Sequence, residues 1–148
     1  MTNTEIRINE EIFIEAFPET VWDYTQDFTK RTEWDSFILK ATVIEESPKK
    51  VHVIGKGNFS AMLVYKQNDR PFKTSLVFAD VKSPIIEGGG GSWRYEKKEN
   101  GTLWTQMGTC ILKPGLFTSI LLPFVKRMLK QNMRTSMSTA KKIIERNK

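Results

Sequence analysis

The period of the hydrophobic pattern changes once along this chain of 148 residues, directly after Pro114 and Gly115. Before that point, short segments rich in β-formers alternate with turn residues. After it, apolar residues recur every three or four positions over roughly 30 residues, which predicts one long amphipathic helix. Pro123 is expected to bend or divide this helix near Leu122, because its ring clashes with the carbonyl four residues back. The periodic residues are Phe117, Ile120, Leu121, Phe124, Val125, Met128, Met133, Met137, Ala140 and Ile144.

Seven segments before this helix have the composition of strands. The first, residues 6–16, alternates between apolar and mostly charged positions and is interrupted by Glu10, which is typical of a half-buried strand. Pro18 and Glu19 then suit the first turn of a short helix, and a second short helix is expected at residues 29–33 with Asp27 as its candidate cap. Further strands are expected at residues 37–45, 50–56, 60–67, 72–81, 85–97 and 102–112. No long helix separates them, so they predict an antiparallel meander.

This order of elements resembles the helix-grip fold of the START-like (SRPBCC) superfamily, which includes polyketide cyclases, lipid-transfer domains and the birch-pollen allergen class. The resemblance covers essentially the whole chain. Locally it is carried by Ala16-Phe17-Pro18 with Val21-Trp22, by Trp34-Asp35, and by Leu122-Pro123-Phe124, which resembles the polyketide cyclase/dehydrase branch.

The resemblance implies a single α+β domain over residues 1–148, in which a curved seven-stranded antiparallel sheet packs across a long C-terminal helix and an apolar ligand lies between them. The glycine run at residues 88–91 departs from the family pattern. Glycine inside a strand usually marks a bulge or a bend. Alternatively, these four glycines widen the ligand cavity because they carry no side chains.

The chain has one cysteine, Cys110, and one histidine, His52. A lone cysteine forms no internal disulfide, and the polar N-terminal segment lacks the pattern of a secretory signal, so a cytoplasmic location is expected. One Cys and one His fall short of a typical zinc site, and we expect no metal and no cofactor. His52 is expected to face solvent between two inward valines, and Cys110 to be a small buried hydrophobe. No nucleophile motif favours a serine triad.

The net charge of +6 is unevenly distributed. Residues 1–47 contain four Lys or Arg residues against eleven Asp or Glu residues, whereas residues 48–148 contain 19 against 6. A solvated surface with mixed charge is the plain interpretation. No recognition motif accompanies the basic residues, so no nucleic-acid partner is expected. No apolar run reaches the roughly 18 residues that span a bilayer.

The resemblance places the ligand-binding residues on the strands and on the last helix, with an opening at the start of that helix and the loop around residues 55–58. Methionine fills irregular space, so the helix methionines suit an adaptable apolar site. Gln106 is a secondary polar candidate. The expected ligand-binding residues are Leu63, Tyr65, Leu76, Phe78, Met107 and Ile111 on strands, Phe124, Met128 and Met137 on the helix, and Glu87, Arg94 and Tyr95 as polar anchors.

Three functions remain open on the sequence. The first is binding or transport of a small hydrophobic molecule of lipid, polyketide or aromatic class. The second is a polyketide cyclase or dehydratase in which Glu87, Arg94, Tyr95 or His52 moves protons. Against it, the sequence shows no general acid and general base at a convincing spacing. The third is contact of the basic, apolar segment 116–130 with an anionic membrane surface. Catalytic residues, ligand identity and oligomeric state are not predicted.

Overall fold

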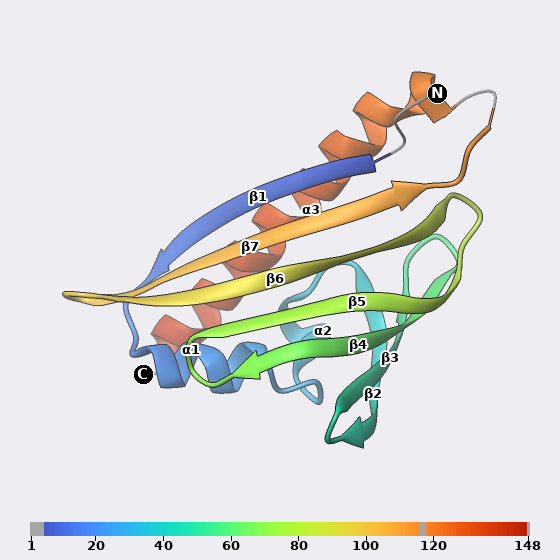
Figure 1. Cartoon of the computed structure of the whole chain (residues 1–148). Coiled ribbons are helices and arrows are strands. Elements are labelled where there is room, and N and C mark those ends of the chain that lie inside the picture. The colour runs from blue at the N-terminus through green and yellow to red at the C-terminus, as the bar shows by residue number, and fades with distance from the viewer. Residues whose placement is uncertain (1–4, 116–117, 148) are drawn as a thin grey trace.

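The computed structural model describes residues 5–115 and 118–147, and over this part of the chain it contains seven strands and three helices (Figure 1). All seven predicted strands are confirmed, each within two residues of its expected bounds. The elements in chain order are β1 (Glu5–Ile14), α1 (Pro18–Thr25), α2 (Arg31–Trp34), β2 (Ile38–Glu46), β3 (Lys49–Gly55), β4 (Phe59–Asp69), β5 (Lys73–Lys82), β6 (Ile86–Lys98), β7 (Gly101–Leu112) and α3 (Thr118–Arg146).

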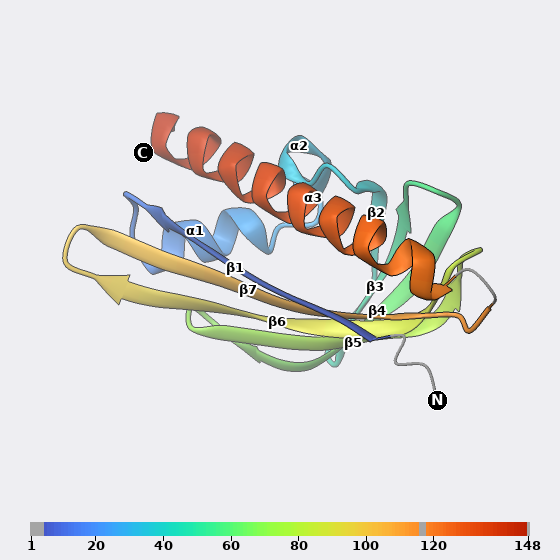
Figure 2. The ribbon, with the colours of Figure 1, turned by 90° about the horizontal axis from the view of Figure 1, so that it is seen from above.

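The strands form one antiparallel sheet in the order β1-β7-β6-β5-β4-β3-β2, so β1 and β2 are its edges. The meander from β2 to β7 follows the chain, and β1 is added beside β7. All three helices lie on one face of the sheet, and α3 runs along that face (Figure 2). The predicted helix-grip architecture is therefore confirmed, and the interior of the protein lies between α3 and the inner face of the sheet.

The second short helix forms within two residues of its predicted bounds, but its predicted cap and the predicted division of the last helix are wrong. The second short helix begins at Arg31 and has no side-chain cap, because the carboxylate of Asp27 accepts the backbone N–H of Thr29 in the preceding turn (3.0 Å). Pro123 does not divide α3, which is continuous from Thr118 to Arg146. Leu122 and Val125, on either side of the proline, pack against the core and hold this end of the helix to the sheet.

Two further points concern the long helix. Phe117, which the periodicity placed at its start, lies outside the described residues. No helix in the described ranges, α3 included, is long and apolar enough to cross a membrane.

The glycine run of β6, residues 88–91, adjoins a bulge, as expected for glycines inside a strand. The register of β6 against β7 shifts between Ile86 and Gly88, as at a β-bulge. Gly89 has φ +149°, and a Cβ there would lie 2.2 Å from the carbonyl oxygen of Thr109. A Cβ on Gly90 would lie 2.4 Å from the carbonyl oxygen of Leu76, on the other side. Side chains larger than hydrogen would therefore push β6 away from both neighbouring strands.

The interior between the sheet and α3 divides into two parts. One part is solidly packed around Trp104, which contacts the rings of Trp93 (5.3 Å between centroids) and Tyr95 (6.2 Å). Met137 closes this part from the helix side. The other part is built around the buried faces of β3 and β4, with Val53 and Leu63 among its core residues. A cavity lies mainly in this second part, and Arg31, Trp34 and Trp93 line it where the two parts meet.

Candidate ligand-binding cavity

A cavity of about 230 Å³ lies between the sheet and α3. Its floor includes one row of paired residues that crosses five strands, in the order Ile8, Gly108, Gly91, Leu76 and Tyr65. The two glycines leave the middle of this row without side chains, so the floor is lowest there. The roof is formed by residues of α3 spaced three or four apart, as one helical face requires. These roof residues are Leu129, Asn132, Met133 and Ser136.

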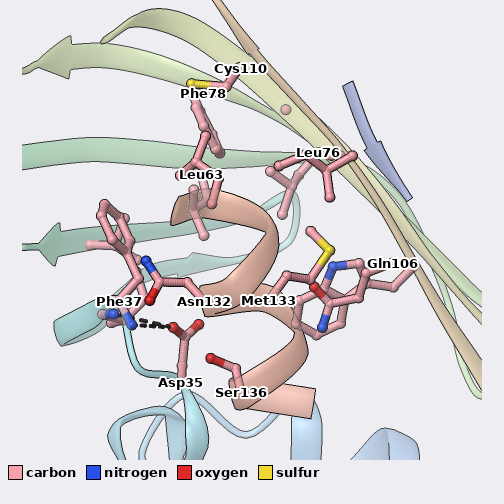
Figure 3. A pocket seen from close by; sticks show the side chains of 18 of the residues that line it. Asp35, Phe37, Leu63, Leu76, Phe78, Gln106, Cys110, Asn132, Met133 and Ser136 are labelled. Atoms are coloured by element: carbon pink, nitrogen blue, oxygen red, sulfur yellow. Dashed lines mark hydrogen bonds between the residues drawn. The ribbon is translucent and has the colours of Figure 1, made fainter. Parts of the chain in front are cut away.

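One end of the cavity is apolar and aromatic. Phe59 contacts Phe37 (5.3 Å between ring centroids) and Phe78 (6.0 Å), and tilted or edge-on pairs of this kind are favourable. Cys110 lies beside Phe78 at this end (Figure 3). Burial raises the pKa of the Cys110 thiol to about 11, so the group stays protonated and neutral near pH 7.

The opposite end is polar and is built where α2 leads into β2. Arg31 and Asp35 form an ion pair across one helical turn, with Nε donating to Oδ2 at 2.7 Å. The other carboxylate oxygen, Oδ1, accepts the backbone N–H groups of Phe37 (2.9 Å) and Ile38 (3.2 Å). Figure 3 shows Asp35 and Ser136 gathered at this end, away from Phe78 and Cys110. The cavity is therefore amphipathic along its length.

A buried chain of hydrogen bonds connects the cavity wall to α1. The Tyr65 hydroxyl donates to Gln26 Oε1 (3.1 Å), and Gln26 Nε2 donates to the Tyr95 hydroxyl (2.9 Å). The Tyr95 hydroxyl lies 2.8 Å from Thr25 Oγ1, which itself donates to the carbonyl of Val21. Burial raises the pKa of Tyr65 to about 12 and that of Tyr95 further still. Both phenols are therefore neutral near pH 7 and serve as fixed hydrogen-bonding groups.

Four of the expected residues, Leu63, Tyr65, Leu76 and Phe78, line the cavity together. They come from neighbouring strands β4 and β5, whose inward positions alternate as predicted. Gln106, the secondary polar candidate, also lines it, as do Gly90 and Gly91 of the glycine run.

Two expected residues of β7 face the other way. On this strand the inward positions are the even ones that include Gln106, Gly108 and Cys110, so Ile111 is outside the cavity. Met107 borders the cavity through the strand itself, but its side chain is 36% exposed beside Arg7 and Ser92 on the outer face. Apolar side chains occupy both parities of β7, so hydrophobicity alone does not identify the inner face.

The charged anchors expected on β6 are not in the cavity. Glu87 and Arg94 are both exposed. The neighbours of Arg94, Trp93 and Tyr95, take the inward positions, and the bulge after Ile86 turns Glu87 outward. His52 is half-buried and does not line the cavity either, because Val51 and Val53 fill the inward positions of β3.

The remaining expected residues lie in other environments. Tyr95 and Met137, both nearly inaccessible to solvent, belong to the solid part of the core around Trp104. Phe124 (67% exposed) and Met128 (50% exposed) lie on the outward side of α3, because the inward side carries Leu122, Val125 and Leu129. Residues 120–129 are apolar on almost every side, so their periodicity does not define one face.

The polar end was not predicted from the sequence. Arg31 and Asp35 stand four residues apart, a spacing that indicates an ion pair on a helix, but such pairs are usually on the surface. Here the pair lies against Trp34 and Trp93 and lines the cavity. Over the described residues no group of three or more His, Cys, Asp or Glu side chains is arranged to hold a metal ion.

Known proteins of the same kind share this architecture. The family model described as polyketide cyclase/dehydrase and lipid transport matches residues 5–145. A comparison with curated proteins gave no match.

Among solved structures, TTHA0849 from Thermus thermophilus superimposes with a TM-score of 0.82 at 14% identity, covering 94% of this chain and 97% of its own. The Zhui aromatase/cyclase from Streptomyces sp. R1128 has a TM-score of 0.82 at 11% identity, with coverages of 96% and 94%. A START superfamily protein from Mycobacterium smegmatis gives 0.77 at 10% identity, with coverages of 96% and 99%.

At these identities the solved structures show a shared fold, and the family model, which spans nearly the whole chain, shows membership. The chain belongs to the polyketide cyclase/dehydrase and lipid transport family.

Proposed function

We propose that this protein binds a small, largely apolar molecule in the cavity between the sheet and α3. The observation that carries the proposal is the unfilled, largely apolar space itself, which Leu63, Leu76 and Phe78 line opposite Met133. Protein interiors are normally close-packed, and leaving apolar space empty costs stability. Ligand-binding sites have this form, with apolar walls and a few convergent polar groups. Burial of the ligand would supply about 25 cal/mol for each Å² of apolar surface.

Two measurements test this proposal. Native and denaturing mass spectra of gently purified protein are compared, and a mass excess that disappears on denaturation identifies the class of a bound compound. Uptake of the neutral dye N-phenyl-1-naphthylamine, followed by its fluorescence, tests the cavity directly. We expect saturable uptake at one site per chain. No dye uptake together with no mass excess would contradict the proposal.

A cyclase or dehydratase activity in the same cavity is the second candidate, and one of the solved structures with this fold is an aromatase/cyclase. The ionisable groups that line the cavity are Arg31, Asp35, Tyr65 and Cys110. Tyr65 and Cys110 are held neutral by burial, and Asp35 already accepts three hydrogen bonds. These groups suit orientation of a polar ligand better than removal of a proton. Incubation of any compound identified by mass spectrometry with fresh protein tests for turnover.

A surface role for α3 is favoured by a separate observation. Ile120, Phe124 and Met128 form an exposed apolar stripe along the start of this helix, with the exposed cations Lys126 and Arg127 nearby. The sequence contains no Asp or Glu between Glu99 and Glu145. Bulky apolar residues with cations are the composition of a helix that rests on an anionic lipid surface.

We expect the protein to sediment with vesicles of equal phosphatidylcholine and phosphatidylglycerol, but not with pure phosphatidylcholine. High salt weakens the electrostatic part of such binding. Phe124→Ser should reduce the sedimented fraction, whereas Leu39→Ser, at an exposed leucine of β2, is the matched control. Equal sedimentation with both kinds of vesicle, or equal loss in both variants, would contradict this role.

A further inference from the structure

The guanidinium of Arg31 is enclosed but uses only part of its hydrogen-bonding capacity. The residue is 9% exposed and lines the cavity. Its Nε donates to Asp35, while no residue of the described structure accepts a hydrogen bond from Nη1 or Nη2. A guanidinium carries five N–H donors, four of them on these two nitrogens. Nη1 and Nη2 are not among the fully buried unpaired atoms of the described structure, so they are accessible at the cavity, and a ligand there can supply acceptors.

Aromatic rings fix the orientation of this group. The guanidinium carbon lies 4.8 Å from the ring centroid of Trp34, 4.9 Å from that of Trp93 and 5.3 Å from that of Phe28. Stacking against these rings and the bond from Nε to Asp35 together restrict the side chain. What remains available is the end of the fork, where Nη1 and Nη2 present parallel N–H groups. That geometry matches the two oxygens of a carboxylate.

A second donor without a partner lies beside it. The indole Nε1 of Trp34 is buried and has no hydrogen-bond partner, and Trp34 also lines the cavity. Unsatisfied buried donors are rare in native proteins and call for an explanation. This nitrogen is closed off from the cavity as well as from solvent, so it is not counted among the groups that a ligand contacts.

The charge of this region also favours an anion. Among the described residues that line the cavity, Asp35 carries the single carboxylate and Arg31 the single permanent cation. Lys49 adds a second cation close by, with its Nζ 5.3 Å from the ring centroid of Phe28 and 5.7 Å from that of Tyr65. Two cations against one carboxylate leave a positive charge that an anionic ligand would neutralise.

We propose that the ligand carries a carboxylate, which Arg31 binds through Nη1 and Nη2, while the apolar body extends toward Phe78 and Cys110. The ligand class is therefore an apolar carboxylic acid rather than a neutral lipid or hydrocarbon. This inference rests on the proposed ligand-binding function and specifies which end of the ligand lies where.

The test uses displacement of N-phenyl-1-naphthylamine by two competitors with the same skeleton, 2-naphthoic acid and 2-naphthamide. The acid and the amide have nearly the same shape and differ in charge. We expect the acid to displace the dye at a concentration roughly tenfold to hundredfold lower, as charge-assisted hydrogen bonds imply. Decanoic acid and decanamide repeat the comparison on a flexible skeleton.

Variants test whether the preference for the acid over the amide depends on the polar end of the cavity. Arg31→Met together with Asp35→Asn removes both charges of the pair, and the amide introduced by the second substitution would keep an oxygen for the N–H groups of Phe37 and Ile38. The dye affinity of the double variant is measured first, and acid and amide are then compared as the ratio of their displacement constants. We expect that ratio to fall to about one in the double variant. Trp34→Phe keeps an aromatic ring but makes the surface on which Arg31 stacks smaller, so it should reduce the preference for the acid only in part. Trp104→Phe is the matched control, because Trp104 Nε1 also lacks a partner but the residue does not line the cavity.

The possible failures are distinguishable. Equal displacement by acid and amide in the unaltered protein, or a preference that survives in the double variant, would overturn the carboxylate assignment and leave the cavity proposal intact. Absence of dye uptake by the unaltered protein would contradict the proposed function itself. Circular dichroism and thermal unfolding show whether each variant is folded.

Discussion

Gly108 and Met133 face each other across the cavity, one from the floor and one from the roof. A Cβ added to Gly108 would lie 3.5 Å from Met133 Cε, an ordinary van der Waals contact with the flexible end of a side chain. The absence of a side chain at Gly108 is therefore not forced by the surrounding backbone, in contrast to Gly89 and Gly90. This glycine sets how much space lies below α3.

Gly108→Leu is expected to fill the middle of the cavity. The new side chain would occupy the space beneath Met133, so uptake of N-phenyl-1-naphthylamine should fall at least about tenfold, as loss of one good apolar contact surface implies. Stability should fall by no more than about 1–3 kcal/mol, because the leucine must displace the flexible end of Met133 on its way into the cavity. Gly88→Leu is the control, since a Cβ there meets nothing within 4 Å and Gly88 does not line the cavity. Normal dye uptake by Gly108→Leu would contradict the assigned floor.

Two methionines of α3 are expected to differ in their contribution to stability. Met137 is 1% exposed in the solid part of the core, and Met137→Ala should cost about 2–5 kcal/mol of unfolding free energy. Met128 is half exposed, so Met128→Ala should change that free energy by less than about 0.5 kcal/mol. Urea denaturation measures both. Similar losses in the two variants would mean that α3 is rotated from the orientation described.

The stability of the protein is expected to fall at alkaline pH partly through Tyr65. Burial raises the pKa of this phenol from 10.0 to about 12. Because the folded-state pKa lies above the unfolded value, the stabilising contribution is complete below pH 10 and is lost as the pH rises from 10 to 12. Two pKa units correspond to about 2.7 kcal/mol.

Tyr65→Phe tests this dependence. The variant should be less stable at pH 8, because Gln26 Oε1 loses its donor. The difference from the unaltered protein should narrow between pH 10 and 12. Denaturation series at several pH values measure it, and a difference that stays constant over that range would be evidence against burial of the phenol.

The thiol of Cys110 is expected to react slowly. Its pKa is raised from 9.0 to about 11 by burial, which reduces the thiolate fraction at pH 8 about a hundredfold. Alkylation by iodoacetamide, followed by mass spectrometry, should be slow in the folded protein and fast in guanidinium chloride. Saturating N-phenyl-1-naphthylamine should slow it further, because Cys110 lines the cavity. Equal rates in folded and denatured protein would contradict this placement.

The fold was predictable because its signals are local. Strand alternation, turn residues and the change of period after Gly115 each depend on neighbouring residues, and together they define the order of elements. The inner face follows less directly from the sequence. On β4, Leu63 and Tyr65 were identified correctly, although Met62 and Val64 make the other parity apolar as well. On β7, apolar residues of both parities concealed the inner face: Ile111 lies outside the cavity, and Met107 borders it with a side chain that is partly exposed.

The polar end depends on contacts between residues far apart in sequence. Arg31 and Asp35 form a local pair, but their role depends on Trp93, which β6 brings from about 60 residues away. Likewise Ser136 enters the site by accepting the backbone N–H of Ser36 (2.9 Å), a contact that no periodicity indicates. Residue spacing predicts which elements form, whereas their packing determines which side chains meet.

The most direct test of the cavity uses the methionine methyl groups as reporters in an NMR titration. Met133 lies in the cavity roof, Met137 in the solid core and Met128 on the exposed side of the same helix. In protein labelled with ¹³C at the methionine methyls, N-phenyl-1-naphthylamine should shift the Met133 signal and give intermolecular NOEs to it, while Met128 stays unchanged. Dye that binds with NOEs to Met128 and none to Met133 would place the ligand on the surface and contradict the account.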